Sequence, residues 1–335
     1  MESATVFEVS RLKDVDINNA MGTTVYVKAL VSKVELKETK TKSHYLNINI
    51  GDRDVKINCK MWNASDATQA EFVPGHIYEL TLSVESYAGK PSCVIKGFRR
   101  LDEKVIDYVE RVDGVDYYTS VVKNAIELIN HESIYYSIVV TIVNAEVIDK
   151  MSVHPAARSW HHNLLGGLIM HIGTMLRAGY SMAQIYNLDV NLVLAGIILH
   201  DIGKLKELLC SVETGEITYT PIGSLYGHIQ IGCQEIDKAA ALLEVEDTEE
   251  VMLLKHCVLS HHGKLEFGSP VEPAIPEALL ISALDGFDAE VYKYNHTIEH
   301  MVPGTSIFEA GKVYYRHEEK MSVPDMSDDS EDSEE

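Results

Sequence analysis

Alternating apolar and polar residues dominate the first hundred positions of the chain. Residues 45–50 (YLNINI) and 55–62 (VKINCKMW) alternate as a strand does when one of its faces is buried. Turn-forming sequences follow or separate such segments: GDRD at 51–54, PG at 74–75 and AGKP at 88–91. The pattern predicts five strands, at residues 23–31, 45–50, 55–62, 77–84 and 92–98. Five short strands in about 80 residues favour a small all-β barrel of the OB or SH3-like type.

The spacing of apolar residues changes near residue 101. Residues 105–112, 117–130 and 134–147 show the three-to-four-residue spacing of helices, so residues 101–150 are interpreted as a helical connector. Residues 192–199 (LVLAGIIL) are continuously apolar but too few to span a bilayer, which predicts a buried helix. We therefore expect a multidomain chain, with an OB-like domain over residues 1–100 and an all-α domain over residues 151–320.

Charge is distributed unevenly along the 335 residues, whose net charge is −22. Residues 1–100 hold 14 of the 29 basic residues but only 12 of the 51 acidic ones. A surface for a polyanion is therefore expected in the first domain. Residues 327–335 (SDDSEDSEE) have no apolar side chain, and we expect residues 321–335 to form a disordered acidic tail.

The sequence shows neither a secretory signal nor a membrane span. The N-terminus has no basic segment followed by an apolar one, and no run reaches about 18 apolar residues. The cysteines are odd in number and form no CxxC pair; they are Cys59, Cys93, Cys210, Cys233 and Cys257. This pattern disfavours a disulfide framework or a thiolate zinc site. We expect a cytoplasmic protein with no membrane partner.

The strongest chemical signal is the sequence LHDIGK at residues 199–204. His200 and Asp201 are adjacent at the end of the apolar run, and Gly203 favours a helix end, where neighbouring side chains can converge. A carboxylate in such a place needs a partner, and a divalent cation would serve. The pair alone is also explained by a capped helix with a buried hydrogen bond.

Further histidine and aspartate residues recur in the predicted helices around this pair. They are His171, His228, the adjacent His261 and His262, and Asp285. Together with the first pair they supply six or seven nitrogen and oxygen donors, which suit Mn²⁺, Fe²⁺, Mg²⁺ or Zn²⁺. Asp201 would bridge two ions. Two ions a few ångströms apart clamp the oxygens of a phosphoryl displacement.

The order of these residues resembles that of the HD-domain phosphohydrolases. The flanking segments are more specific: HHNLLGGLIMH, LAGIILHDIGK, GHIQIG and LSHHGKLEFGSPVEPAIPEALLISALD are similar to those of the YhaM-type 3′–5′ exoribonucleases. The resemblance extends from about residue 20 to residue 300, is looser in the first domain and leaves out the acidic tail. It implies an OB domain joined to an HD domain, and metal-dependent removal of nucleotides from the 3′ end of single-stranded RNA and DNA.

Taken residue by residue, the resemblance implies a metal-ligand set. Its members are His171, His200, Asp201, His228, Asp285 and one or both of His261 and His262. We expect two divalent ions, with Mn²⁺ ahead of Mg²⁺, Fe²⁺ and Co²⁺.

Two further residues of the resembling segments are expected to act with Asp201 in catalysis. Lys204 would lie near the scissile phosphate and neutralise developing charge, unless it is a solvated cation at a helix end. His162 would contact a substrate phosphate or protonate the leaving 3′ oxygen, although a core hydrogen bond explains it equally well. Asp288 is either a carboxylate that supports a metal ligand or part of a solvated helix face, and the solvated face is the favoured interpretation.

The first domain contains candidate contacts for a nucleic-acid strand. Residues 33–42 are expected to form a lysine-rich loop between the first two strands, and OB folds bind strands across such loops. The predicted contacts are Lys37, Lys40, Lys42, Tyr45, Trp62 and Tyr87, with Phe98 as a further stacking candidate. A solvated hairpin and aromatic residues of the barrel core are the alternative explanation.

The expected function is a metal-dependent 3′–5′ exonuclease, in which the OB domain holds a single strand of RNA or DNA for the HD domain. One alternative is a hydrolase of small or cyclic nucleotides. Another is a non-catalytic single-strand-binding adaptor. The oligomeric state is left open, with a homo-oligomer among the options.

Overall fold

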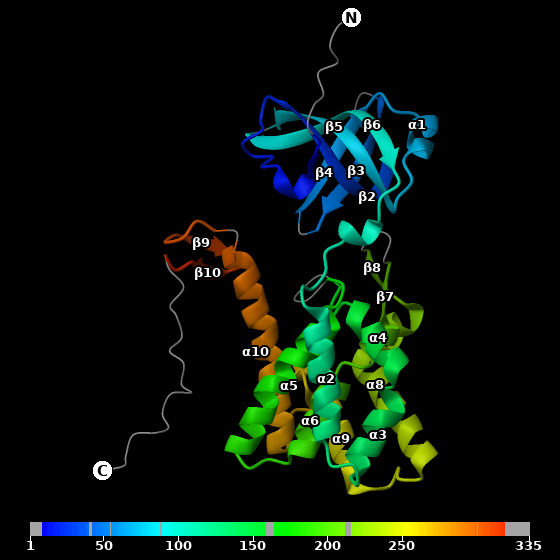
Figure 1. The fold of residues 1–335 in the computed structure, drawn as a ribbon, viewed down its shortest axis with the longest axis vertical. Helices are drawn as coiled ribbons and strands as arrows, with labels where there is room; N and C mark the ends of the chain where they lie inside the picture. Colours follow the sequence, from blue (N-terminus) through cyan, green and yellow to red (C-terminus); the bar gives the residue numbers. More distant parts are fainter. Residues whose placement is uncertain are drawn as a thin grey trace, which may run out of the picture.

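A β-barrel and a helical domain lie at opposite ends of the molecule (Figure 1). The computed structural model describes residues 9–39, 42–53, 55–87, 89–158, 164–211, 216–299 and 301–318. The expected fold class, an OB-type barrel followed by a helical domain, is confirmed. The helical domain also carries two short hairpins that the sequence did not predict, β7–β8 (Leu208–Cys210 and Ile217–Tyr219) and β9–β10 (Ser306–Glu309 and Lys312–Tyr315).

The barrel is a closed sheet with the strand order β2-β3-β4-β6-β5, in which β5 pairs back onto β2. Its strands are β2 Thr24–Glu38, β3 His44–Asp52, β4 Val55–Trp62, β5 His76–Tyr87 and β6 Lys90–Leu101. The pair β4–β6 is parallel, and helix α1 (Asp66–Glu71) connects β4 to β5. A short strand β1 (Ser10–Arg11) adds to β2, followed by the 3-10 turn η1 (Leu12–Asp14). All five strands expected from alternation are present, and five strands in a closed Greek-key barrel define the OB fold.

Alternation along β3 shows how the barrel core forms. Leu46, Ile48 and Ile50 are buried, whereas the residues between them lie on the outer face. Phe98 belongs to this core and not to a binding surface, because its ring lies 4.1 Å from that of Phe72 between centroids. The prediction that Phe98 stacks on nucleic acid is therefore wrong.

The lysine-rich loop expected at residues 33–42 is mostly strand. Strand β2 runs on to Glu38, which pairs with His44 of β3, so only a short connection follows. Lys33 and Lys37 lie within the strand, and both form ion pairs with Glu35, at 2.7 and 3.0 Å. Cross-strand pairing thus extended the strand beyond the segment that alternation predicted.

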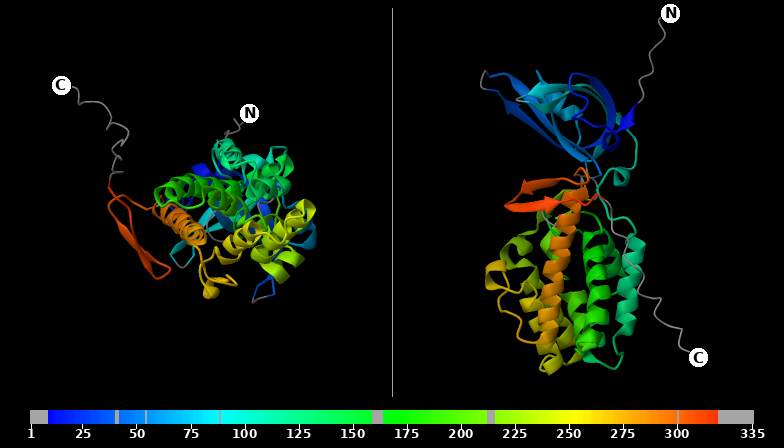
Figure 2. Two further views of the ribbon diagram at one scale, coloured as in Figure 1. Left: turned by 90° about the horizontal axis from the view of Figure 1, so that it is seen from below. Right: turned by 90° about the vertical axis from the view of Figure 1, so that its left-hand side faces the viewer.

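The helical domain is a bundle in which α2, α5 and α10 run side by side (Figures 1 and 2). Its helices are α2 Val115–Leu128, α3 Ile134–Ile142, α4 Ala145–Val153, α5 Gly167–Ile185, α6 Val190–Leu199, α7 Lys204–Glu207, α8 Pro221–Leu243, α9 Glu249–Ser260 and α10 Pro276–Glu299. Helices α2 and α3 share one apolar core with α5, α6, α9 and α10. The β-branched segment of α3 is helical because this core buries it and because Ser133 caps its first turn.

Residues 105–112 are not the helix that the spacing predicted. Only the 3-10 turn η2 (Val105–Asp107) forms, and Val109 then bridges to Arg53 of the barrel. Tyr108 and Val109 are buried together with barrel residue Leu30 at the junction of the domains. Burial between two domains, and not on one helix face, accounts for their apolar spacing.

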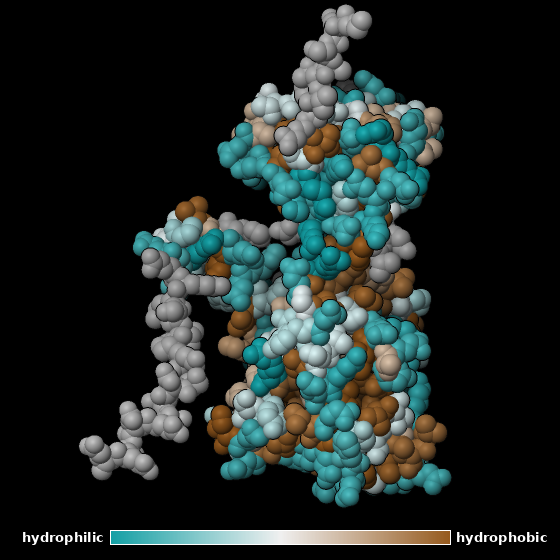
Figure 3. Space-filling view, in the orientation of Figure 1, coloured by the Kyte–Doolittle hydropathy of each residue, from teal (hydrophilic) through white to brown (hydrophobic). Residues whose placement is uncertain are grey.

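The surface differs between the two domains. On the face drawn in Figure 3, hydrophilic residues cover most of the barrel, and apolar patches lie over the helical domain. The β9–β10 hairpin extends from the end of α10 that faces the barrel (Figure 2). No helix in the described part of the chain is long and apolar enough to cross a membrane. The predicted acidic tail, residues 321–335, lies outside the described residues.

Candidate metal centre

The helix ends and one helix face bring all seven predicted metal donors together. His171 lies on α5, His200 and Asp201 follow α6, His228 lies at a kink in α8, His261 and His262 follow α9, and Asp285 lies on α10. Four of these residues are completely buried, namely His171, His200, Asp201 and His261. Such burial of polar side chains requires partners inside the protein.

Two glycines shape the backbone at the centre. A Cβ at Gly203 would lie 2.0 Å from the main-chain oxygen of His228, so only glycine lets the turn after Asp201 pack against α8. Gly227 has φ 71° and ψ 159°, which breaks α8 just before His228. Both glycines bring the end of α6 and His228 within reach of each other.

The donors form two groups with Asp201 between them. One group is His171, His200 and Asp285, and the other is His228, His261 and His262; within each, one atom per residue lies within 4.8 Å of the others. Asp201 Oδ2 lies 3.3 Å from His200 Nε2 and 3.7 Å from His171 Nε2. Its Oδ1 lies 3.5 Å from His228 Nε2 and 3.7 Å from His261 Nε2. One carboxylate therefore faces both groups, one oxygen to each.

Main-chain carbonyl groups orient three of the histidines. Nδ1 of His200 lies 2.7 Å from Ile197 O, Nδ1 of His261 lies 2.7 Å from Val258 O, and Nδ1 of His262 lies 2.9 Å from Phe267 O. A ring whose Nδ1–H donates to a carbonyl keeps a lone pair on Nε2. This tautomer is the one that binds a metal ion through Nε2.

Carboxylates orient the other two histidines. His171 Nδ1 lies 2.7 Å from Asp288 Oδ2, so the interpretation of Asp288 as a solvated helix face is wrong. The face of α10 that carries Asp285 also presents Asp288, one turn later, to α5. Glu207 accepts hydrogen bonds from both Nδ1 and the main-chain N–H of His228, at 3.1 and 3.0 Å.

Glu207 is a site residue that no pattern in the sequence marks. Burial would raise its pKa, but the hydrogen bonds from His228 lower it, so the carboxylate is ionised and accepts. It lies 21 positions before His228 and only 8% exposed. Its proximity to the HDIGK segment was the one signal available, and that signal does not distinguish it from a surface residue.

Three buried atoms at the centre have no hydrogen-bond partner among the described residues. They are Asp201 Oδ1, His228 Nε2 and His261 Nε2. A buried polar atom left without a partner costs about 1–3 kcal/mol. All three are electron-pair donors around one space, so the residues present fit a bound cation.

Electrostatics at the centre also favour cation binding. Burial would raise the pKa of Asp201, but Lys204 and His200 outweigh it and hold that pKa well below its ordinary value. Burial, followed by the nearby His200, lowers the pKa of His261 well below its usual range, which keeps this imidazole neutral. Burial would lower the pKa of His171, but Asp285 and Asp288 raise it to about 9. A bound cation would displace that proton.

A cavity of about 470 Å³ opens onto the donors. Lys204 lines it, and its Nζ lies 2.6 Å from Asp201 Oδ2 with the side chain 9% exposed. The alternative of a solvated helix-end cation is therefore excluded for Lys204. His162 lies outside the described residues.

On the barrel, the predicted aromatic contacts gather on one outer face. Tyr45 and Trp62 are direct cross-strand partners whose ring centroids lie 5.2 Å apart. Lys60 Nζ lies 5.4 Å from the ring centroid of Trp62 and 5.5 Å from that of Tyr87. Tyr87 is 72% exposed and Trp62 44% exposed, so these rings are available to a ligand.

The predicted lysines lie less regularly than the aromatic residues. Lys37 pairs across the strands with Tyr45, Lys42 is exposed in the connection to β3, and Lys40 lies outside the described residues. Lys60 was missed, although it precedes Trp62 by two positions in an alternating strand and so shares its face.

Comparisons with known proteins agree with this site. Residues 168–290 match the HD domain family. The chain is 35% identical to the 3′–5′ exoribonuclease YhaM of Bacillus licheniformis, over 78% of this chain and 83% of that protein. The chain belongs to the YhaM family of 3′–5′ exoribonucleases.

Other YhaM proteins and a solved structure extend the comparison. The YhaM protein of Listeria monocytogenes is 32% identical, over 82% of this chain and 88% of its own. The second OB-fold domain of replication protein A from Methanococcus maripaludis has 12% identity and a TM-score of 0.23, over 29% of this chain and 98% of that domain. The HD domain of this YhaM-family chain implies dependence on a divalent metal ion.

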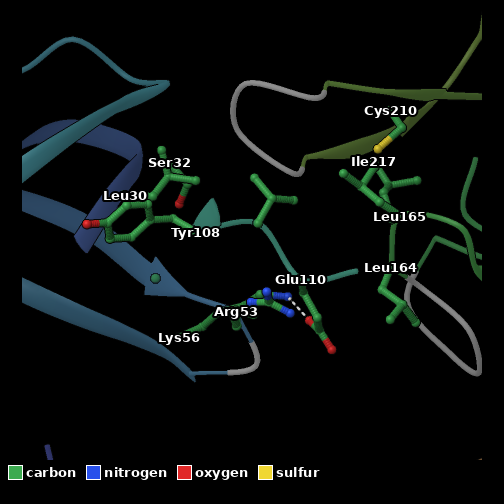
Figure 4. Close-up of a pocket in the computed structure, with 12 residues that line it drawn as sticks. Leu30, Ser32, Arg53, Lys56, Tyr108, Glu110, Leu164, Leu165, Cys210 and Ile217 are labelled. Atoms are coloured by element: carbon green, nitrogen blue, oxygen red, sulfur yellow. Dashed lines mark hydrogen bonds and ion pairs between the residues drawn. The ribbon is translucent and has the colours of Figure 1, made fainter. Parts of the chain in front are cut away.

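A second, smaller cavity lies where the barrel meets the helical domain (Figure 4). Its volume is about 50 Å³, and it is closed on one side by an ion pair of 2.8 Å between Lys56 and Glu110. Cys210 and Ile217 of the β7–β8 hairpin line it opposite barrel residue Leu30. A space of this size excludes a nucleotide, so this cavity belongs to the domain junction and not to a substrate site.

Proposed function

We propose that this chain is a metal-dependent 3′–5′ exonuclease that degrades single-stranded RNA, with single-stranded DNA as a second substrate. The observation that carries the proposal is Asp201, whose two oxygens face two donor groups. Each group has at least one member, Asp285 in one and His228 and His262 in the other, on the wall of one open cavity. Relatives whose sequences match this chain over most of their own length are named 3′–5′ exoribonucleases. Family membership also disfavours the non-catalytic adaptor.

The donor groups suggest how two divalent ions would be held. We assign His171, His200 and Asp285 to one ion, His228, His261 and His262 to the other, and Asp201 to both. Nitrogen and oxygen donors favour Mn²⁺, with Mg²⁺, Fe²⁺ and Co²⁺ as alternatives. When bound, such ions lower the pKa of a water molecule and neutralise the oxygens of the scissile phosphate.

The remaining residues would complete the reaction. Lys204, held against Asp201, would place its charge beside the phosphate and stabilise the negative charge that develops there. His162 would donate a proton to the leaving 3′ oxygen. Tyr45, Trp62 and Tyr87 would stack on bases, and Lys37, Lys40, Lys42 and Lys60 would contact the strand backbone. In this proposal the OB domain spans residues 1–100 and the HD domain residues 151–320. The connector, residues 101–150, packs its helices into the core of the HD domain. The enzyme would be cytoplasmic and free to form homo-oligomers.

A hydrolase of small or cyclic nucleotides is the second candidate. The cavity of about 470 Å³ favours this second candidate, because a single nucleotide fills such a volume. The exposed aromatic face of the barrel favours the exonuclease, because a small nucleotide has no use for it.

The test is a time course with 5′-labelled single-stranded RNA and DNA oligomers, with Mn²⁺ and with a chelator. A metal-dependent ladder that shortens from the 3′ end is the expected result. The rates on the RNA oligomer and on the DNA oligomer report the sugar preference. Intact oligomers, with bound metal verified on the same protein, would favour the small-nucleotide hydrolase.

A further inference from the structure

Two exposed aromatic side chains line the same cavity as the metal donors. Tyr219 of β8 is 47% exposed and Phe267, in the 3-10 turn η3 (Leu265–Phe267), is 62% exposed. Scattered exposed aromatic residues need no explanation on their own. These two line a cavity whose other walls include His228, His262 and Asp285. They are therefore placed beside the reacting part of a bound substrate.

Both aromatic residues are tied directly to the metal centre. Tyr219 pairs with Leu208 in the β7–β8 hairpin, and Leu208 directly follows Glu207, which orients His228. The main-chain oxygen of Phe267 lies 2.9 Å from His262 Nδ1. The main chain of each aromatic residue is thus held close to one of the donor histidines or to the residue that orients it.

Arg158 adds a positive charge at the same cavity. Its guanidinium carbon lies 5.6 Å from the centroid of the Tyr219 ring. No carboxylate within the described ranges forms an ion pair with Arg158, which lines the cavity together with Lys204. An arginine with free donors recognises phosphate oxygens with two parallel hydrogen bonds.

We infer that Tyr219 and Phe267 bind the nucleobase of the 3′-terminal nucleotide, and that Arg158 binds its phosphate. The inference rests on the proposed function and specifies how that site holds its substrate. The cavity, at about 470 Å³, lies in the range of sites that enclose one small molecule. Because every base has an aromatic face, stacking here holds the four terminal bases with little preference.

The kinetic test compares two RNA oligomers that differ only in the terminal base. One ends in an ordinary nucleotide and the other in an abasic nucleotide. For Phe267→Ala and Tyr219→Ala we expect KM on the ordinary oligomer to rise roughly ten-fold with little change in kcat. On the abasic oligomer, wild type and variants should have the same KM. Tyr219→Phe should keep the difference in KM between the two oligomers that Tyr219→Ala loses, because stacking does not use the hydroxyl.

A matched control separates this site from general effects of removing an exposed ring. Phe308, on β9, is 75% exposed and does not line the cavity, so Phe308→Ala should leave both KM values unchanged. The metal content of each variant should equal that of wild type. Equal losses on ordinary and abasic oligomers, or no loss on either, would overturn the inference.

A binding measurement tests the inference independently of catalysis. Titration of the Mn²⁺-loaded protein with adenosine monophosphate and with ribose 5-phosphate should show a roughly ten-fold preference for the nucleotide, which Phe267→Ala abolishes. Arg158→Ala should weaken the binding of adenosine monophosphate but not the binding of adenosine. Equal affinity of the wild-type protein for adenosine monophosphate and ribose 5-phosphate would overturn the inference. If the protein prefers the nucleotide but leaves the oligomers intact, the proposed exonuclease activity is contradicted and the base-binding site is not.

Discussion

Among the residues that the structure describes, Asp201 is the one carboxylate that contacts both donor groups. Its oxygens point in different directions, and Lys204 holds one of them at 2.6 Å. A carboxylate can bind a cation through each oxygen, whereas a carboxamide of the same shape has one oxygen and one N–H donor group. The charge of Asp201, more than its volume, is what the centre requires.

Asp201→Asn should therefore abolish hydrolysis and leave strand binding nearly unchanged, since the barrel face lies in the other domain. We expect a loss of at least roughly a thousand-fold in kcat, the scale set by the removal of a principal charge-stabilising group. The measurement is the oligomer ladder together with the Kd for an unlabelled strand. Activity close to wild type would contradict the assignment of this residue.

Glu207→Gln should weaken metal binding without removing a donor. The carboxylate that orients His228 would become an amide, and loss of such a partner typically reduces metal affinity about 10–100-fold. Calorimetric titration with Mn²⁺ measures this directly. Glu146→Gln, at an exposed position of α4, is the control and should bind Mn²⁺ as wild type does. Equal affinities in the two variants would refute the role of Glu207.

At the scale of residues, the donors were predictable and their partners were not. His200 and Asp201 stood out because polar residues at the end of an apolar helix need a partner. Asp288 and Glu207 looked like ordinary charged residues, because their role depends on the rotation of α10 and on the approach of α7 to α8. The spacing of residues along the sequence determines neither the rotation of α10 nor the approach of α7 to α8.

Among the elements, strands β3 and β4 supply most of the aromatic face by alternation, and Tyr87 joins it from the end of β5. Tyr45, Lys60 and Trp62 emerge on one side because residues two apart share a face and because Tyr45 and Trp62 are cross-strand partners. The face is thus a property mainly of paired strands and not of a loop. Loops differ more readily than paired strands, so a binding face of this kind has a rigid geometry.

Trp62→Ala should weaken binding of a single-stranded RNA oligomer and spare hydrolysis of a dinucleotide. Stacking on one aromatic side chain contributes about 1–3 kcal/mol, so Kd should rise roughly ten-fold or more. Tyr186→Ala is the control, because Tyr186 is exposed at the far end of α5. Fluorescence anisotropy measures the binding, and unchanged binding in Trp62→Ala would rule out this face as the platform.

The turn between α6 and α7 depends on Gly203. A methyl group there would meet His228 O at 2.0 Å, so Gly203→Ala must shift the turn or α8. We expect a loss of about 1–3 kcal/mol in the free energy of unfolding, together with weaker metal binding. Gly286→Ala is the control: nothing lies within 4 Å of its added Cβ, and alanine favours the helix α10. Denaturant unfolding measures the stability of both variants. Equal stabilities of Gly203→Ala and Gly286→Ala would contradict the close approach of the turn to α8.

Prediction of elements succeeded where one local pattern had one explanation. The five barrel strands and the helices α2 and α6 followed from spacing. Residues 134–147, expected as one helix, instead form α3 and the start of α4, because Asn144 caps a new helix after the chain leaves helical geometry at Val143. The prediction of a helix over residues 105–112 was wrong because the same apolar spacing also arises when a connection is buried between two domains. The two hairpins were missed because strands of three or four residues are too short to show a period.

Across the whole molecule, the two domains are joined by apolar packing as well as by the chain. Leu30 and Ile77 of the barrel pack with Val109 and Leu165, and Arg11 bonds to Asp52 and to the carbonyl oxygen of Asp107. A strand bound to the barrel would therefore be presented to a cavity in a fixed relation to it. Charge follows the same division, since the acidic excess lies outside residues 1–100.

Deletion of residues 1–100 should reduce kcat/KM on long strands far more than on dinucleotides. A dinucleotide needs only the cavity of the helical domain, which would hold its 3′-terminal nucleotide, whereas a long strand loses its second binding surface. Initial rates on RNA of two and of twenty nucleotides measure the ratio, and circular dichroism confirms that the remaining domain is helical. An equal reduction on both lengths would assign the barrel a structural role.

The way the histidine rings are held has a consequence for how this centre changes over generations. Three of the five rings are oriented by carbonyl oxygens of the main chain, which every amino acid supplies. The other two depend on the side chains of Glu207 and Asp288. Heritable variation in those two positions can retune the preference for one metal ion over another while the donor set itself stays intact.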